Sequence, residues 1–369
     1  PPNVGNLFRL SAEAVPAAER LTRELAGIRP SYYLQGFSPQ EVEDILAGTD
    51  YDLAWITPIR CLGLVDQCRQ NNITLARRIA IGLNDVKTTL YYNVFREGTA
   101  RRSFDLRKIR QGLRIPVIWH YERRYFNEAD LIHVQTPLEA QRAVKLYGPE
   151  VQSKIVIAPN GRKVELEQCT YAGIDTPVVL YMTQLRGGRE KEAKWFVREV
   201  WPEIRRSRRD AVLWLVGPPP EPGSWVLSDL PDGVVIRGFV DDLAELFDQI
   251  RLAVVPITHS TGLINRVVDA MVAGVPLVSS PEALATVPDL APGQHALAAS
   301  TREEYVNAIL QLFDNRRKRE ELAQNAAHFG RQLPDWDSSV STVMDAVESV
   351  SGRDASSPGA RTENLDEAH

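Results

Sequence analysis

The sequence has few residues of the kinds that form disulfide frameworks, metal centres or membrane anchors. Its 369 residues include three cysteines and six histidines, with no C-x-x-C pair and no cluster of histidines. We therefore expect neither disulfide bonds nor a zinc site, and we expect the protein to reside in a reducing compartment. No apolar run approaches the roughly 18 residues that cross a membrane. We therefore predict a cytoplasmic protein that needs no metal ion or cofactor.

Signatures of several large classes of ligand-binding protein are also missing. The formal net charge is -5, so the molecule as a whole lacks the basic character typical of nucleic-acid binding. Neither a G-x-G-x-x-G fingerprint nor a P-loop is present, which disfavours nicotinamide-dependent and ATP-dependent enzymes. The chain begins at PPNVGN without a methionine, and we expect a further strand upstream.

What the sequence does contain is a regular alternation of short apolar segments and longer helical patterns. Strands are expected at 51–56, 77–83, 130–135, 154–159, 177–182, 211–217, 234–239, 252–257 and 276–280. Helical patterns lie between them, for example at 190–207, 262–273 and 302–330. Continuous apolar strands separated by helices predict parallel sheets that are covered on both faces. The predicted fold class is α/β, with two doubly wound Rossmann-like domains.

Length and composition predict two domains, because 44% of the residues are hydrophobic and one core rarely grows to this size. The two series of strands meet near residue 165, which gives an N-terminal domain over 1–165 and a C-terminal domain over 166–335. A C-terminal helix over 336–351 could cross back to the N-terminal domain. The tail 352–369 has almost nothing to bury and is predicted to be disordered.

The segment ITHSTGLINRVVDAMVAGVPLVSS, residues 257–280, reads as a strand end, a turn of small polar residues and an apolar helix. In open parallel sheets, ligands bind beyond the carboxyl ends of the strands, where loops meet helix N-termini. We expect the N–H groups of Leu263, Ile264 and Asn265 to be free. Together with the helix dipole, they would form an anion site suited to a diphosphate.

Asp269 is the single acid of this apolar helix. It lies about two turns beyond the start, too deep to cap the helix. A carboxylate at that depth can accept hydrogen bonds from hydroxyl groups such as those of a ribose. The alternative is that Asp269 pairs with Arg266 one turn earlier, or is simply exposed.

Several motifs follow one another over about 130–330, and their order and spacing are informative. They are DLIHVQTPLEAQ, KIVIAPNG, AKWFVREVWPEI, AVLWLVGPPP, VVIRGFVDDLAELFDQIRLAVVPI and STGLINRVVDAMVAGVPLVSSPEAL. This series resembles the donor domain of GT-B glycosyltransferases, specifically the retaining family-four, or group 1, type. The resemblance implies two domains facing a cleft and a hexosyltransferase-like, metal-independent enzyme. Such an enzyme transfers a sugar from a nucleotide diphosphate to an acceptor hydroxyl with retention at C1. Among the nucleotide sugars, we expect a UDP- or GDP-linked donor.

Members of that family commonly have two glutamates eight positions apart around this helix, and the second contacts the nucleotide ribose. Here the second position is Asp269 and the first is Thr261. The resemblance implies a ribose contact for Asp269, while Ser260, Thr261 and backbone N–H groups hold the donor. For His259, a ligand contact and a structural role fit equally well. The candidate donor-binding residues are Gly5, Gly217, His259, Ser260, Thr261, Gly262, Leu263, Ile264, Asn265, Arg266 and Asp269.

Family members also place a basic pair on the diphosphate, after the first strand of the donor domain. Strict spacing puts Thr183 and Gly188 at those positions, but Arg186, Arg189 and Lys191 lie close by in LRGGREK. We predict that Arg186 or Arg189 stabilises the leaving group, in place of a metal ion.

Two further segments carry candidate residues at predicted strand ends. Asn84 and Asp85 in AIGLND could contact the transferred sugar or the acceptor, and a turn or helix cap is an equally compatible role. Gly5 in PPNVGN resembles the glycine of the family's first loop, which lets the backbone approach the donor phosphate and the acceptor.

The segment 96–114 is the most basic part of the sequence, with seven arginines and lysines against two acids. As a helix it would have a basic face with an apolar edge, suited to an anionic membrane or a lipid-linked acceptor. A solvated surface helix is the alternative. The first interpretation predicts peripheral contact with the inner face of the membrane.

Three functions compete on this sequence. The first is a glycosyltransferase acting in glycan, polysaccharide or glycoconjugate synthesis. The second is another enzyme on the same scaffold, such as a sugar-nucleotide epimerase or a phosphorylase, although no cofactor lysine of a phosphorylase is identifiable. The third is a catalytically silent partner subunit, because Thr261 replaces the family's first acid. Fold alone does not distinguish them.

Overall fold

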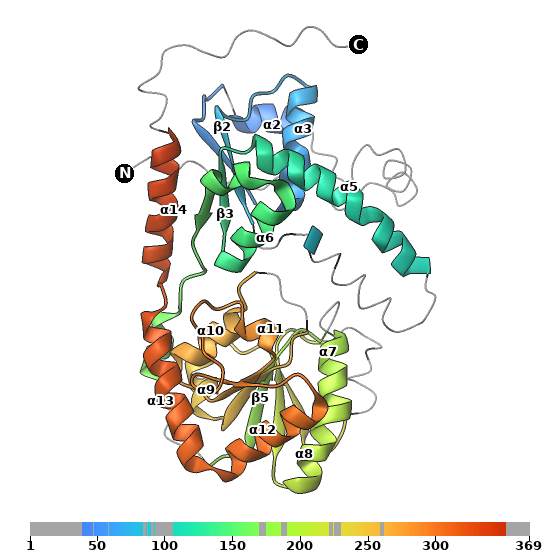
Figure 1. Ribbon diagram of the computed structural model, residues 1–369, viewed down its shortest axis with the longest axis vertical. Helices are drawn as coiled ribbons and strands as arrows, with labels where there is room; N and C mark the ends of the chain where they lie inside the picture. Colours follow the sequence, from blue (N-terminus) through green and yellow to red (C-terminus); the bar gives the residue numbers. More distant parts are fainter. Residues whose placement is uncertain are drawn as a thin grey trace. The chain divides into compact units, whose positions relative to one another are not determined.

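The structure is a computed structural model, and its described residues form two compact units (Figure 1). The described residues are 39–46, 48–57, 59–83, 86, 88–89, 92, 106–169, 175–185, 190–220, 224, 230–258 and 262–351. Unit 1 contains those up to Val134, with Ala140–Ala158 and those from Val340 onward. Unit 2 contains Gln135–Glu139 and Pro159–Ser339. Each unit is an α/β domain on a parallel sheet, which confirms the predicted fold class.

Unit 1 is built on a four-stranded parallel sheet in the order β1-β2-β3-β4. Its strands are β1 (Leu53–Ile56), β2 (Arg78–Gly82), β3 (Leu131–Val134) and β4 (Ile155–Ile157). Its helices are α2 (Pro39–Leu46), η1 (Ile59–Leu62), α3 (Gly63–Gln70), α5 (Leu106–Glu128), η2 (Pro149–Lys154) and most of α6 (Pro137–Tyr147). Trp55 of β1 lies opposite Ala80 of β2, and Ile81 lies opposite Ile132 of β3.

The two faces of this sheet are covered by different helices, because successive strand residues point to opposite sides. Ile81 and Ile132 belong to a core with Phe126 of α5 and residues of α3 and α6. Their neighbours Ala80 and Leu131 pack on the other face against the last turns of α14 (Trp336–Ser351). Helix α14 begins in unit 2 and continues into unit 1.

Unit 2 has a six-stranded parallel sheet in the order β10-β9-β8-β5-β6-β7. The strands are β5 (Val178–Met182), β6 (Val212–Val216), β7 (Val234–Gly238), β8 (Leu252–Val255), β9 (Leu277–Ser279) and β10 (Leu297–Ala298). Counted along the chain from β5, this is the 3-2-1-4-5-6 order of dinucleotide-binding domains. The order reverses between the neighbouring strands β5 and β8.

Helices cover both faces of this sheet (Figure 1). One face packs against α7 (Glu190–Trp195), the π-helical turn η5 (Phe196–Val200), α8 (Trp201–Ser207) and α12 (Arg302–Asp314). The other packs against η3 (Val164–Gln168), α9 (Leu243–Asp248), α10 (Asn265–Val272), α11 (Pro281–Leu284) and α13 (Arg316–Gln332). None of the helices formed by the described residues is both long and apolar enough to cross a membrane.

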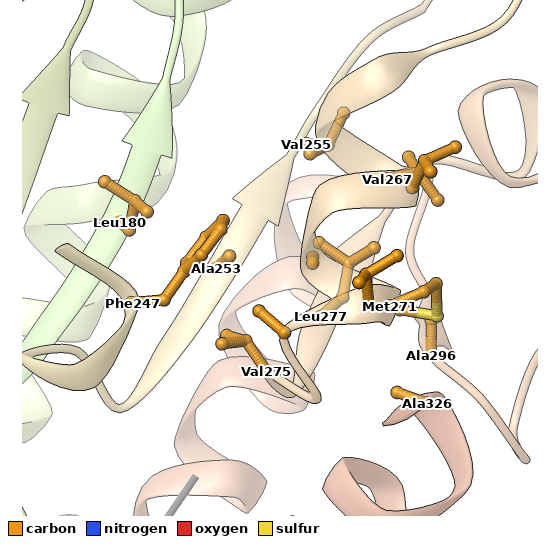
Figure 2. Close-up of a cluster of buried hydrophobic side chains, with 14 of the residues drawn as sticks. Leu180, Phe247, Ala253, Val255, Val267, Met271, Val275, Leu277, Ala296 and Ala326 are labelled. Atoms are coloured by element: carbon orange, nitrogen blue, oxygen red, sulfur yellow. The ribbon is translucent and has the colours of Figure 1, made fainter. Parts of the chain in front are cut away.

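The apolar character of α10 follows from its position in the core of unit 2. Figure 2 shows Val267 and Met271 of α10 near Val255 of β8, Leu277 of β9 and Ala326 of α13. Val267 and Met271 are fully buried, and burial of one such side chain contributes about 2 kcal/mol. Packing on both the sheet and α13 therefore fixes the direction of α10.

Candidate functional site

The carboxyl ends of β5 and β8 define the edge of unit 2 at which sheets of this order bind ligands. Strand β5 runs into Thr183, ahead of Arg186 and Arg189. Strand β8 runs into residues 258–264, which we call the donor turn, and then into α10. The two segments predicted to hold the donor therefore start from neighbouring strands, at the point where the strand order reverses.

Gly217 ends β6 beside the start of the loop that follows β5. Its N–H donates to the Gly238 carbonyl at 2.8 Å, and the Thr183 N–H donates to the Val216 carbonyl at 2.8 Å. The φ angle of Gly217 is 149°, and a Cβ atom there would lie 2.0 Å from the Thr183 carbonyl oxygen. Only glycine fits this position, because the backbone of the β5 loop occupies the space of a side chain.

Side chains from three parts of unit 2 hold the donor turn. Glu192 of α7 accepts the Thr258 N–H at 3.0 Å and the Thr258 hydroxyl at 3.1 Å. The next three bonds run from the Gly262 N–H to Glu139 Oε1 at 3.2 Å, from the Leu263 N–H to Gln135 Oε1 at 3.3 Å, and from the Ile264 N–H to Thr286 Oγ1 at 3.2 Å. The turn is thus fixed at both ends.

The prediction that Leu263 and Ile264 offer free N–H groups is wrong, because both N–H groups already donate to side chains. Buried backbone donors are nearly always paired, and here the partners come from outside the helix. Ile264 is the N-cap in an extended conformation, so α10 begins at Asn265, three residues later than expected. Asn265 is exposed, and as the first helical residue its N–H has no acceptor within the helix.

The side chain of Asn265 is also positioned by the protein. Asn160 donates to Asn265 Oδ1 at 3.1 Å, and Gln135 donates to Asn160 Oδ1 at 3.1 Å. Asn160 follows strand β4 in the segment APNG, residues 158–161. Its role was not anticipated from the sequence, although its place after a strand end was a usable signal.

Asp269 is buried, with 7% of its surface exposed. Its ion-pair partner is Lys163, whose Nζ lies 3.5 Å from Oδ2. Simple exposure is therefore wrong for Asp269, and its close ion-pair partner is Lys163, while Arg266 acts on it at longer range. Burial raises the pKa of the Asp269 carboxyl and Glu165 raises it further, whereas Lys163 and Arg266 lower it. No local pattern predicts the contact with Lys163, which is 106 residues away from Asp269 in the chain.

The remaining candidates lie outside the described residues. They are Gly5, Asn84, Asp85, Arg186, Arg189, His259, Ser260 and Thr261. Residues 96–105 of the basic segment lie outside them too, and residues 106–114 form the first turns of α5.

Comparison with known proteins places this geometry in context. Residues 176–315 match the family model described as "Glycosyl transferases group 1". Sucrose-phosphate synthase from Thermosynechococcus elongatus superposes with a TM-score of 0.66 at 17% identity, over 93% of this chain and 82% of that chain. HepE from Anabaena in complex with UDP gives a TM-score of 0.60 at 15% identity, over 84% of this chain and 82% of that one. No match was found among curated proteins.

A third solved structure extends the comparison. The pneumococcal O-GlcNAc transferase GtfA, in complex with UDP and GlcNAc, gives a TM-score of 0.59 at 15% identity. The match covers 86% of this chain and 60% of that chain. At these identities, the superpositions establish the shared GT-B fold. The family match over 176–315 falls within unit 2.

Proposed function

We propose that the protein is a retaining, metal-independent glycosyltransferase that moves a sugar from a nucleoside diphosphate to the hydroxyl group of a glycan or lipid-linked acceptor. The observation that carries the proposal is Asp269, a buried carboxylate in the helix that follows the donor turn, within the segment matched by the group 1 model. UDP is the first nucleotide to test, because the HepE and GtfA structures contain it.

The proposed chemistry follows from where negative charge develops. Transfer requires the bond between C1 and the diphosphate oxygen to weaken through an oxocarbenium-like transition state. The Asn265 N–H, at the start of α10, and the arginines of the β5 loop would stabilise the departing diphosphate. Asp269 would accept hydrogen bonds from the ribose hydroxyls, and Asn84 and Asp85 would contact the sugar or the acceptor.

Incubation with labelled UDP-sugars tests the reaction itself. We expect label to move to an acceptor, and excess UDP to raise the melting temperature, since ligand at a hundred times its dissociation constant contributes about 2.7 kcal/mol. An epimerised nucleotide sugar or free sugar without any transfer product would favour an epimerase. Nucleotide binding without turnover would favour a silent subunit.

Asp269→Asn is expected to weaken UDP binding about tenfold while the fold is kept, because charge-assisted hydrogen bonds to the ribose become neutral ones. Isothermal titration calorimetry measures the effect. Asp337→Asn, at an exposed position in α14, is the matched control and should bind UDP like the parent. An unchanged dissociation constant in a folded Asp269→Asn variant would remove Asp269 from the nucleotide site.

Lys163→Met is expected to make UDP binding more dependent on pH. Burial raises the pKa of Asp269 and Lys163 opposes this, so loss of the cation raises the pKa further, with Glu165 and Arg266 still in place. The ionised carboxylate is the better acceptor, so the variant loses affinity as the pH falls, and at a higher pH than the parent. We expect the loss of UDP affinity relative to the parent to be larger at pH 6 than at pH 8.5, because protonation of the carboxyl weakens the acceptor.

Calorimetric titrations across this pH range provide the measurement. Lys163→Arg retains the positive charge and serves as the control. In the double variant Lys163→Met with Asp269→Asn, the added pH dependence should vanish. Parallel pH profiles for Lys163→Met and the parent would show that Lys163 does not control the ionisation of Asp269.

A further inference from the structure

Two helices of the protein begin with the same sequence pattern, T-x-x-E. The pattern is TPLE at residues 136–139, before α6, and TREE at residues 301–304, before α12. It is the signature of a capping box, in which each side chain bonds to the other residue's backbone N–H. Helix α12 forms that box: the Glu304 N–H donates to Thr301 Oγ1 and the Thr301 N–H donates to Glu304 Oε2, both at 3.2 Å.

At α6 only half of the box is formed. The Glu139 N–H donates to Thr136 Oγ1 at 3.1 Å, as the pattern predicts. The Glu139 carboxylate instead accepts the Gly262 N–H at 3.2 Å, and no bond returns to it from the Thr136 N–H among the described residues. Glu139 is 1% exposed, so a buried carboxylate has been diverted from its local helix to a turn 123 residues away.

The same short segment holds the next residue of the turn. Gln135 accepts the Leu263 N–H. The successive N–H groups of Gly262 and Leu263 therefore both donate to side chains of the segment 135–139. Gly262 has a φ of 76°, a left-handed backbone conformation that favours glycine, two residues before the N-cap of α10. The conformation of Gly262 and Leu263, which lead the chain into α10, therefore depends on these acceptors.

We propose that Glu139 is a positioning residue of the donor site: by accepting the Gly262 N–H it holds Gly262–Ile264, which lead into α10, in the conformation that receives the nucleoside diphosphate. The inference rests on the proposed function. Because Glu139 acts through an acceptor oxygen, its charge is not required. An uncharged acceptor of the same shape keeps the bond to the Gly262 N–H, and an apolar side chain removes it.

Three variants of the full chain separate this role from general stability. Glu139→Leu is expected to bind UDP about tenfold more weakly than the parent in isothermal titration calorimetry. Glu139→Gln keeps the acceptor oxygen, so its UDP affinity should equal the parent's. Glu304→Leu, the matched control at α12, should lower the melting temperature and leave UDP affinity unchanged.

Two results would overturn the proposal. One is a Glu139→Leu variant that binds UDP like the parent, and the other is a Glu139→Gln variant that is as impaired as Glu139→Leu. If Glu139→Leu does not fold, Glu139→Asp replaces it, because the shorter side chain withdraws the carboxylate from Gly262. We expect about fivefold weaker UDP binding for Glu139→Asp, and parental affinity would again contradict the proposal.

Measurements of UDP binding and sugar transfer by the parent protein distinguish a failure of this inference from a failure of the proposed function. If the parent neither binds UDP nor transfers a sugar from any UDP-sugar, the proposed function has failed whatever the variants do. If the parent binds UDP and all Glu139 variants bind it equally well, the proposed function stands and the positioning role alone is lost.

Discussion

Gly217→Ala is expected to lower the free energy of unfolding by about 4 kcal/mol, from backbone strain and steric overlap together. The added Cβ would lie 2.0 Å from the Thr183 carbonyl oxygen, and the φ of 149° is one that side chains rarely allow. Relief requires β6 to separate from the start of the β5 loop, which breaks the hydrogen bond between Thr183 and Val216. Urea unfolding followed by tryptophan fluorescence measures the loss.

Gly238→Ala is the matched control for this prediction. Gly238 accepts the Gly217 N–H and has a φ of 72°, but a Cβ atom there would meet no atom within 4 Å. Its substitution should therefore cost only the left-handed backbone penalty, about 1 kcal/mol. If both variants lose the same free energy of unfolding, the backbone at Thr183 moves easily away from the new side chain. Backbone strain alone would then account for the requirement for glycine at position 217.

The second large effect is expected at the β5 loop. Arg186→Ala or Arg189→Ala should reduce turnover about a hundredfold at saturating acceptor, the usual scale for removing one group that stabilises developing charge. A guanidinium can bind two phosphate oxygens at once, and the two glycines between these arginines let the backbone approach the diphosphate. The measurement is the rate of sugar transfer from the UDP-sugar that proves active.

The same assays test independence from metal ions. Excess EDTA should leave the rate of the parent unchanged, and Arg317→Ala, at an exposed position in α13, should transfer sugar like the parent. Loss of transfer in EDTA, or full turnover by both Arg186→Ala and Arg189→Ala, would contradict the arginine mechanism. In that case Lys191, at the start of α7, is the next basic residue to substitute.

Local sequence patterns were sufficient to predict the fold class and most of the elements near the site. Strand β8 is buried at every position, as its continuous apolar run predicts for a strand covered on both faces. The start of α10 was misplaced, because helical periodicity continues through Gly262 and Ile264. The backbone there is not helical, and the side chains that hold it come from outside the helix.

The partners within the candidate site could not be read from the sequence. Lys163 and Asp269 are 106 residues apart, and Glu139 and Gly262 are 123 residues apart. Nothing in either local segment specifies such a pair. The pattern TPLE predicts a full capping box, but only the bond to Thr136 forms and the Glu139 carboxylate binds Gly262. Periodicity also does not give the strand order, which brings the ends of β5 and β8 together.

The division of the chain between the two units affects how donor domains can be exchanged among related proteins. The chain passes from one unit to the other after Val134, Glu139, Ala158 and Ser339. A continuous piece taken as Pro159–Ser339 contains the whole six-stranded sheet but leaves behind Gln135 and Glu139. In a chimaera built from that piece, the other protein supplies the residues that contact Gly262 and Leu263. Residues 135–139 must therefore be transferred together with Pro159–Ser339 if these two residues are to keep their native hydrogen bonds.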